Sequence, residues 1–174
     1  MPIAPRPARP ARLRSGPATP ATDGTSIATA TGSVANDPGS PFHHRSGRKL
    51  HLHPDPVWDG DGPIWCAEGP RVRLAGIAAR EIDGTCRPGQ PCPTASGPAA
   101  RDGLVALLGG PRGRRPEGHV LVKAPPMHCR SDGSAGGSRT AAWCRTGDGR
   151  DLNCALIEAG FALRWPRYWR SHRC

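Results

Sequence analysis

The chain has 174 residues, a formal net charge of +10 and a pI near 10.3, and only 5% of its residues are aromatic. This length excludes two domains with separate cores, and it allows one domain with or without a tail. The positive charge attracts polyanions, of which nucleic acid is the commonest, although charge alone fits a merely soluble basic protein equally well. No apolar stretch is long enough to span a membrane.

The first part of the chain is predicted to be a tail. Pro, Ala and Arg repeat from Pro5 to Arg12, and Thr, Ser, Ala and Gly then follow without an apolar period. Such a segment cannot bury enough surface to offset the entropy lost on ordering. We therefore expect a disordered tail over residues 1–54 and one folded domain over residues 55–174.

The folded part is expected to begin with a hairpin. Val57 leads into Asp59 to Pro63, whose Asp, Gly and Pro are typical of a turn, and Ile64 to Cys66 resume an extended pattern. Residues 71–76 then alternate between apolar and other side chains, which predicts a strand with Arg73 on its polar face.

A helix and a second group of strands are predicted next. Apolar residues recur at helical spacing over residues 99–108, and two glycines end the run. A basic turn over residues 112–115 leads to an extended segment over residues 120–122. Residues 127–130 and 139–145 are expected to pair across a Gly-rich loop over residues 132–138.

A second helix is predicted to begin after Asp151, which is suited to the N-cap, and to end at Gly160. The order of elements is then strands, helix, strands, helix. This order predicts a mainly β fold of the α+β kind, namely a five-stranded, partly open OB-type barrel with two to three helices. A generic α+β fold fits the order nearly as well.

The cysteines favour disulfides over zinc, because no two of them have the Cys-x-x-Cys spacing. Cys86 and Cys92 close a Pro/Gly-rich loop, and Cys129 and Cys144 would face each other on neighbouring strands. This usage suggests export or a periplasmic location, whereas the absence of a clear signal peptide argues against it. The odd count leaves one thiol over. The seven cysteines are Cys66, Cys86, Cys92, Cys129, Cys144, Cys154 and Cys174.

Three ordered blocks together resemble the thermonuclease family, of which staphylococcal nuclease is the type. Asp59-Gly60-Asp61 matches the family's DGDT turn, and the segment from Val72 to Glu81 matches its RLxGIDAPE stretch. The segment from Asp151 to Ala162 matches its DLNxxLVxxGxA helix. Each block alone is a weak signal, but the ordered set covers about two thirds of the chain and is fairly specific.

The resemblance implies an OB barrel and a calcium-dependent phosphodiesterase that acts on DNA and RNA. By resemblance, Arg73 is a phosphate-binding arginine, Glu81 is the general base and Asp61 is one of two carboxylates that bind Ca²⁺. The second catalytic arginine matches Arg139. Such groups suit the reaction because guanidinium groups stabilise charge on the phosphoryl oxygens and a carboxylate activates water.

The chain departs from the family pattern at the metal site. Ala78 stands where the family has its second calcium-binding Asp, and Arg80 stands where it has Pro. Calcium requires six or more oxygen ligands with several carboxylates among them, and a nearby cation weakens such a site further. We therefore expect calcium-dependent hydrolysis to be weakened or lost.

Basic and aromatic residues alternate near the end of the chain, where Arg164, Arg167 and Arg170 are candidate nucleic-acid contacts. Alternatively, Trp165 and Trp169 pack this segment onto the domain while the arginines stay solvated. The leading interpretation is an OB domain that binds nucleic acid or a phosphodiester. The alternatives are an active phosphodiesterase, with Asp59 or Asp83 completing the cation site, and a disulfide-stabilised interaction domain without catalysis.

Overall fold

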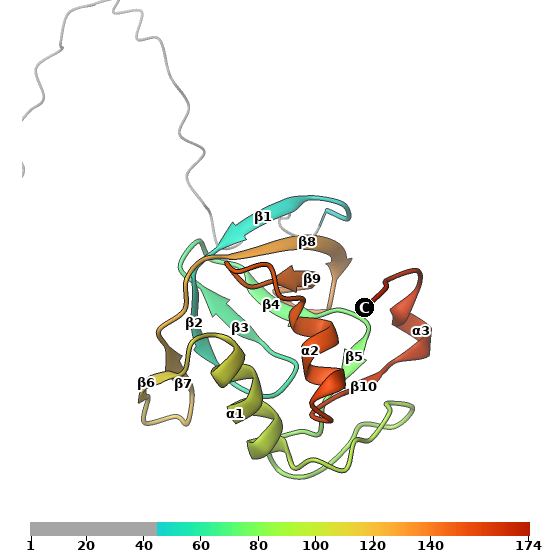
Figure 1. Cartoon of the computed structure of the whole chain (residues 1–174). Coiled ribbons are helices and arrows are strands. Elements are labelled where there is room, and N and C mark those ends of the chain that lie inside the picture. Colours follow the sequence, from blue (N-terminus) through green and yellow to red (C-terminus); the bar gives the residue numbers. More distant parts are fainter. Residues whose placement is uncertain (1–44) are drawn as a thin grey trace, which may run out of the picture. The chain divides into compact units, whose positions relative to one another are not determined.

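A computed structural model describes residues 45–174, which form a curled half-barrel sheet with three helices beside it (Figure 1). The main sheet has eight strands in the order β1-β8-β9-β4-β3-β2-β7-β6, and β10 and β5 form a separate pair. The strands are β1 (Lys49–Leu52), β2 (Pro54–Val57), β3 (Ile64–Cys66), β4 (Arg71–Leu74), β5 (Ile77–Ala78), β6 (Pro111–Arg114), β7 (Val120–Val122), β8 (Met127–Ser134), β9 (Arg139–Arg145) and β10 (Leu163–Arg164). The helices are α1 (Gly97–Leu107), α2 (Leu152–Glu158) and α3 (Pro166–Trp169). The predicted mainly β class is confirmed, and the main sheet has eight strands rather than five.

A parallel pair of strands lies at the centre of the sheet. The segments β2, β3 and β4 form an antiparallel meander, and β4 then pairs in parallel with β9. In this register Arg71 lies opposite Arg139 and Arg73 lies opposite Ala141. Because side chains two residues apart in a strand share a face, Arg73 and Arg139 lie on the same face of the sheet.

The folded part begins earlier than the boundary expected at residue 55. Strand β1 lies within the segment predicted to be tail, and it pairs antiparallel with β8. Leu50 and Leu52 are buried while Lys49 and His51 are exposed, so the strand has one apolar face. An alternation of only four residues is too short to stand out from a polar segment. Residues 1–44 of the predicted tail lie outside the described residues.

Both predicted helices are present and have side-chain caps. Ser96 Oγ accepts a hydrogen bond from the Ala99 N–H at 3.3 Å, so α1 begins two residues before the predicted start. Asp151 caps α2 as expected, because Oδ1 accepts from the Cys154 N–H at 3.1 Å. The two helices bring Leu104 and other apolar side chains into the core beneath the sheet.

Two segments that the sequence predicted to be loops partly form strands. The basic turn over residues 112–115 contributes to β6, whose residues are all exposed. Strand β8 continues through Asp132 to Ser134 by means of an irregularity between Ser131 and Gly133, so the Gly-rich loop is shorter than predicted. Among the described residues, no helix is both long and apolar enough to cross a membrane.

The disulfides fasten three separate parts of the domain. Cys129 and Cys144 are bonded at directly opposite positions of β8 and β9. A second bond, between Cys86 and Cys92, closes the loop that precedes α1. Both pairs match those expected from the sequence. A third bond joins Cys154 to Cys174, and Cys66 is a buried free thiol.

Candidate functional site

The turn between β2 and β3 directs two carboxylates into the protein. A Cβ atom at Gly60 would lie 2.4 Å from the Ala100 Cβ, and one at Gly62 would lie 2.5 Å from the Val72 carbonyl oxygen. The glycines therefore allow the turn to pack closely against α1 and β4. As a result Asp59 is only 4% exposed and Asp61 only 2% exposed.

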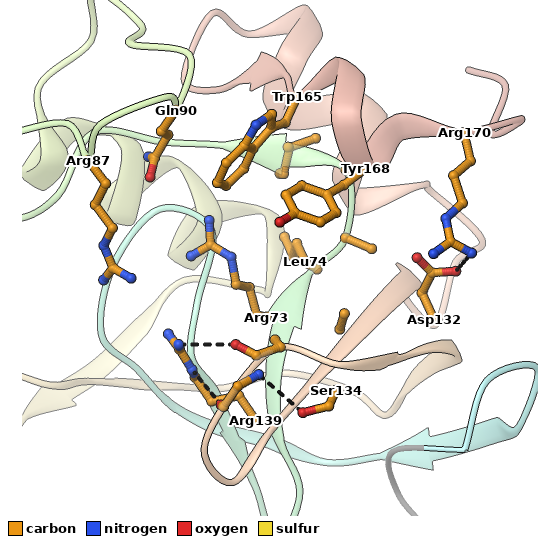
Figure 2. Close-up of a pocket in the computed structure, with 16 residues that line it drawn as sticks. Arg73, Leu74, Arg87, Gln90, Asp132, Ser134, Arg139, Trp165, Tyr168 and Arg170 are labelled. Carbon is orange, nitrogen blue, oxygen red and sulfur yellow. Dashed lines mark hydrogen bonds and ion pairs between the residues drawn. The ribbon is translucent and has the colours of Figure 1, made fainter.

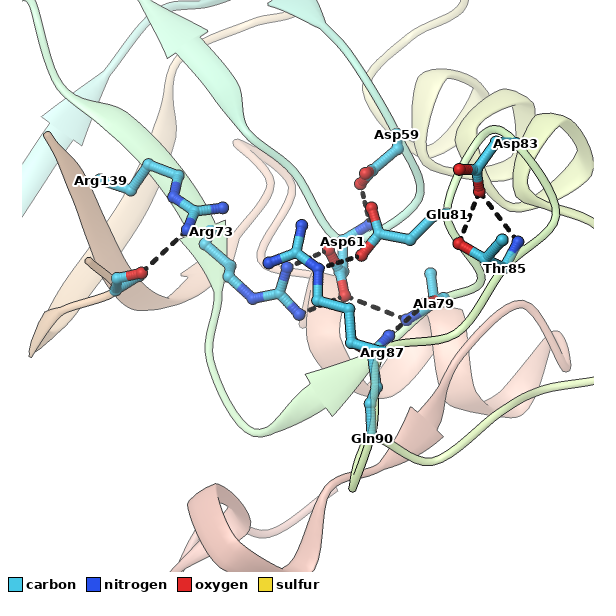
Figure 3. A network of polar contacts seen from close by, with 11 residues as sticks. Asp59, Asp61, Arg73, Ala79, Glu81, Asp83, Thr85, Arg87, Gln90 and Arg139 are labelled. Carbon is cyan, nitrogen blue, oxygen red and sulfur yellow. Dashed lines mark hydrogen bonds and ion pairs between the residues drawn. The ribbon is translucent and has the colours of Figure 1, made fainter. Parts of the chain in front are cut away.

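Asp61 forms a two-pronged ion pair with Arg73 of β4 (Figure 3). Arg73 Nη1 donates to Oδ1 at 2.7 Å and Nη2 donates to Oδ2 at 2.6 Å. The Ala79 N–H also donates to Oδ2 at 3.0 Å. Both oxygens of Asp61 are therefore engaged by protein groups, in the parallel geometry that arginine forms with carboxylates.

Burial changes the protonation of the acidic groups in this turn. Burial raises the pKa of Asp59 to about 8, and the nearby Asp61 and Glu81 charges contribute to the rise. This shift in the pKa of Asp59 favours its protonated form. Burial also raises the pKa of Asp61, but the Arg73 guanidinium opposes that rise and stabilises the carboxylate form.

Glu81 lies just after β5 and forms an ion pair with Arg87, whose Nε is 2.8 Å from Oε1. Arg87 belongs to the loop closed by Cys86 and Cys92. Sequence reasoning did not select Arg87. The sequence did contain a signal for Arg87, because it is a basic residue six positions after Glu81 and lies between two cysteines that close a loop.

Arg139 begins β9, and backbone carbonyls hold its side chain. Its Nε donates to the Gly136 oxygen at 3.3 Å, and its Nη2 donates to the Ala135 oxygen at 3.1 Å (Figure 2). Two cavities of about 400 and 340 Å³ adjoin here, and Arg73, Arg87 and Arg139 line both of them. Three guanidinium groups therefore border both cavities, which together are called the arginine hollow.

The larger cavity has an aromatic wall from the segment around α3. The rings of Trp165 and Tyr168 meet edge to face with centroids 4.8 Å apart (Figure 2). Arg170 also lines this cavity, and its Nη1 lies 3.6 Å from Oδ1 of Asp132. The hollow thus combines guanidinium groups with flat apolar surfaces.

The other two candidate arginines near the end of the chain lie against aromatic rings. Arg164 lies over the Trp169 ring at 4.8 Å, and Arg167 lies over the Tyr168 ring at 5.4 Å. Neither residue lines the two cavities. Trp169 packs against the core, which agrees with the alternative that the aromatic residues of this segment pack onto the domain.

The residues present do not fit a calcium ion. Ala78 is fully buried in β5 and supplies no oxygen ligand from its side chain, and Arg73 already covers both oxygens of Asp61. Among the described residues, no three acidic groups of this site bring their oxygens within 4.8 Å of one another. Asp83 accepts hydrogen bonds from its neighbour Thr85. Asp83 lines neither cavity, so it does not join Asp59 and Asp61 in a calcium site.

The Arg80 side chain is held by backbone carbonyls outside the two cavities. Its Nε and Nη2 donate to the Pro93 oxygen at 3.3 and 3.0 Å, and its Nη1 donates to the Gly84 oxygen at 2.8 Å. It lines neither cavity. Arg80 therefore stabilises the loop before α1.

The asparagine of the third sequence block has a structural role that supports the site. Asn153 is fully buried; its Nδ2 donates to the Ala75 oxygen at 2.7 Å, and its Oδ1 accepts from the Cys144 N–H at 3.2 Å. It thereby links α2 to the end of β4 and to β9. These are the strands that carry Arg73 and Arg139.

The structure brings three of the residues singled out from the sequence into one place. Arg73, Glu81 and Arg139 line the smaller cavity, and Asp61 lies behind Arg73. No protein-family model matches the chain, and neither a curated protein nor a solved structure matches it.

Proposed function

We propose that the protein binds the phosphodiester backbone of a single-stranded nucleic acid in this hollow and that its hydrolytic activity is weak or lost. The observation that carries the proposal is that Arg73, Arg87 and Arg139 line both adjoining cavities. Planar guanidinium groups bind phosphate oxygens through paired hydrogen bonds. The charge of +10 on the whole chain adds long-range attraction to a polyanion.

The aromatic wall favours a single strand over a duplex. Proteins that bind single strands combine a basic groove with aromatic rings on which unpaired bases stack. Trp165 and Tyr168 lie in the same cavity as the three arginines, so a base and its phosphate could be bound together. Bases in a duplex are stacked on each other and cannot reach these rings.

We further propose that the curled sheet is an OB-type barrel of the thermonuclease kind with additional strands. Support comes from the meander of β2, β3 and β4, the helix α1 that follows, and the parallel pairing of β4 with β9. Strand β7 pairs with β2, the first strand of the meander. On this assignment β1, β6 and β8 extend a five-stranded unit.

Hydrolysis is disfavoured because the acidic groups of the site, Glu81 and Asp61, are already paired with arginines. A general base needs a carboxylate that can accept a proton from water, but Glu81 is in contact with Arg87. Arg73 must also leave Asp61 before it can contact a phosphate with both of its terminal nitrogens. Each rearrangement costs free energy before any chemical step.

The second candidate function is an active phosphodiester hydrolase. It is favoured by one observation: Glu81 lines the same cavity as Arg73 and Arg139, as a base acting beside a bound phosphate would. A bound phosphate could draw Arg87 away from Glu81 and free the carboxylate. The same experiment must therefore measure cleavage and binding.

The test combines plasmid degradation, with calcium or with EDTA, and filter binding of DNA and RNA single strands over a range of salt concentrations. We expect intact plasmid and retention that falls with salt. Arg139→Ala should flatten the plot of log affinity against log salt by about 0.7. Arg150→Ala is the matched control, because Arg150 is exposed and lines neither cavity.

Each other outcome selects a different function. Plasmid cleavage that Glu81→Gln abolishes would identify an enzyme and refute the loss of hydrolysis. Neither cleavage nor retention would refute nucleic-acid binding and leave the disulfide-stabilised interaction domain. Equal losses of affinity in Arg139→Ala and Arg150→Ala would show that binding depends on overall charge and not on the hollow.

A further inference from the structure

Four metal-ligating side chains meet at a place separate from the arginine hollow. Ligand atoms of Asp151, Cys154 and His172 all lie within 4.8 Å of one another. His172 Nε2 is 3.0 Å from Asp151 Oδ2 and 3.6 Å from the Cys154 Sγ. Cys174 joins the group because its sulfur is bonded to Cys154.

These spacings resemble those around a tetrahedral zinc ion. Zinc binds nitrogen and oxygen at about 2.0 to 2.2 Å and sulfur at about 2.3 Å, which places neighbouring ligand atoms about 3.3 to 3.8 Å apart. The separation of 3.6 Å between the nitrogen of His172 and the sulfur of Cys154 falls within this range. The His172 and Asp151 atoms, at 3.0 Å, need only a small displacement.

The surroundings hold these ligands in place. The His172 ring stacks on the Trp143 ring at a centroid distance of 4.0 Å and an interplanar angle of 15°. Asp151 uses Oδ1 to cap α2, so Oδ2 is the atom that faces His172. Only 12% of the side chain is exposed for each of these two ligands. Such positioning by neighbouring groups is typical of metal sites in proteins.

We propose that opening the Cys154–Cys174 disulfide creates a zinc site formed by Cys154, Cys174, His172 and Asp151. A dithiol reductant supplies two electrons and two protons, the S–S bond breaks, and the reductant becomes a disulfide. Zinc then displaces the protons of the two thiols and binds both sulfurs as thiolates. A disulfide oxidant reverses the exchange: it takes two electrons from the two thiolates and two protons from water and becomes a dithiol, the S–S bond forms again, and the zinc ion leaves.

The charge balance suits this exchange. Two thiolates and one carboxylate around Zn²⁺ leave one net negative charge. Nη2 of Arg145 lies 3.5 Å from Asp151 Oδ2 and offsets that charge. In its reduced state the protein therefore has a charge-compensated metal site in place of two free thiols.

The exchange would fasten the same segment in both redox states. Residues 163–174 carry Trp165, Tyr168 and Arg170, which line the larger cavity of the hollow. The disulfide ties this segment to α2 when the protein is oxidised, and the zinc ion would tie it there when the bond is open. The metal site itself does not depend on the proposed nucleic-acid binding.

The test is cobalt titration of the full chain after reduction with a phosphine, followed by displacement with zinc. Co²⁺ is the probe because tetrahedral thiolate coordination gives visible bands and a sulfur-to-metal charge-transfer band. We expect one equivalent of Co²⁺ with both features, which zinc then removes. The oxidised protein should show no charge-transfer band.

Replacing the proposed zinc ligands one at a time tests which side chains bind the metal. Cys154→Ser, Cys174→Ser and His172→Gln should each reduce cobalt affinity at least about tenfold. Joint replacement of Cys86 and Cys92 by serine is the matched control and should leave binding unchanged. Cys174 is exposed, so its substitution tests the site even if Cys154→Ser impairs folding.

An independent measurement is the thermal midpoint of the reduced protein. Zinc in excess of its dissociation constant should raise the midpoint by at least about 5 °C in the wild type, and much less in His172→Gln. The proposal is overturned if the reduced wild type shows no charge-transfer band. It is also overturned if the band persists unchanged in Cys174→Ser and His172→Gln.

Discussion

Asp59 is a buried acid that should destabilise the folded protein as the pH rises. Its pKa is raised from 3.8 to about 8, chiefly because burial disfavours the carboxylate. Below pH 3.8 both the folded and the unfolded states hold the proton, so the group has no effect. Between pH 3.8 and 8 the unfolded chain releases the proton and the folded protein keeps it, so the free energy of unfolding falls as the pH rises.

Asp59→Asn removes this effect while it keeps the shape of the side chain. The Asn oxygen can still accept from the Asp61 N–H, as Oδ1 of Asp59 does at 3.2 Å. Each unit of pKa shift corresponds to about 1.4 kcal/mol, which sets an upper limit of about 5 kcal/mol at pH 8. Because Arg73 and water in the smaller cavity can rearrange around an ionised Asp59, we expect the variant to be more stable by about 2 kcal/mol at pH 8.

The assay is urea unfolding of both proteins at pH 4, 6 and 8. The stability difference between variant and wild type should be near zero at pH 4 and should grow at each higher pH. Glu117→Gln, at an exposed carboxylate between β6 and β7, is the control and should follow the wild type. A constant difference across the three pH values would refute the argument, because it would show that Asp59 titrates alike in the folded and unfolded states.

Three further predictions concern the metal, the aromatic wall and the disulfides. Calorimetry at millimolar calcium should show no one-site binding, because Ala78 offers no carboxylate and Asp61 is already paired; clear one-site binding would contradict this. Tyr168→Ala should weaken single-strand binding by about 1 to 3 kcal/mol and duplex binding much less in filter-binding assays, whereas equal losses would argue against stacking. Replacing Cys129 and Cys144 by alanine should lower the free energy of unfolding by about 3 kcal/mol in urea, because their bond closes a 15-residue loop, and a loss below about 1 kcal/mol would be inconsistent.

Local patterns predicted those parts of the fold that local chemistry determines. The capping side chain of Asp151 accepts from an N–H only three residues along the chain, so the start of α2 was visible in the sequence. The Asp-Gly-Asp turn was visible for the same reason. Cys129 and Cys144 could be paired because both belong to segments with a clear extended pattern.

Features that depend on distant contacts could not be predicted in the same way. Strand β1 is stabilised by pairing with β8, which is far away in the sequence, and its own four residues carry little signal. Arg87 contacts Glu81 from a loop that a disulfide closes, and this contact depends on how the loop folds. The Cys154–Cys174 bond requires the end of the chain to fold back onto α2, which no local pattern indicates.

The Arg73–Asp61 ion pair connects the predicted site with the proposed loss of catalysis. In the family pattern the acid binds a cation and the arginine binds a phosphate, so the two groups have different partners. On the proposed assignment, Ala78 leaves the cation position without a second carboxylate, and Arg73 neutralises Asp61 instead. Because Asp61 occupies the edge of Arg73 formed by Nη1 and Nη2, an incoming phosphate must displace Asp61 to bind that edge. Arg87 is likewise paired with a carboxylate, that of Glu81, whereas the partners of Arg139 among the described residues are neutral carbonyls. We therefore expect Arg139 to make the first contact with a nucleic acid.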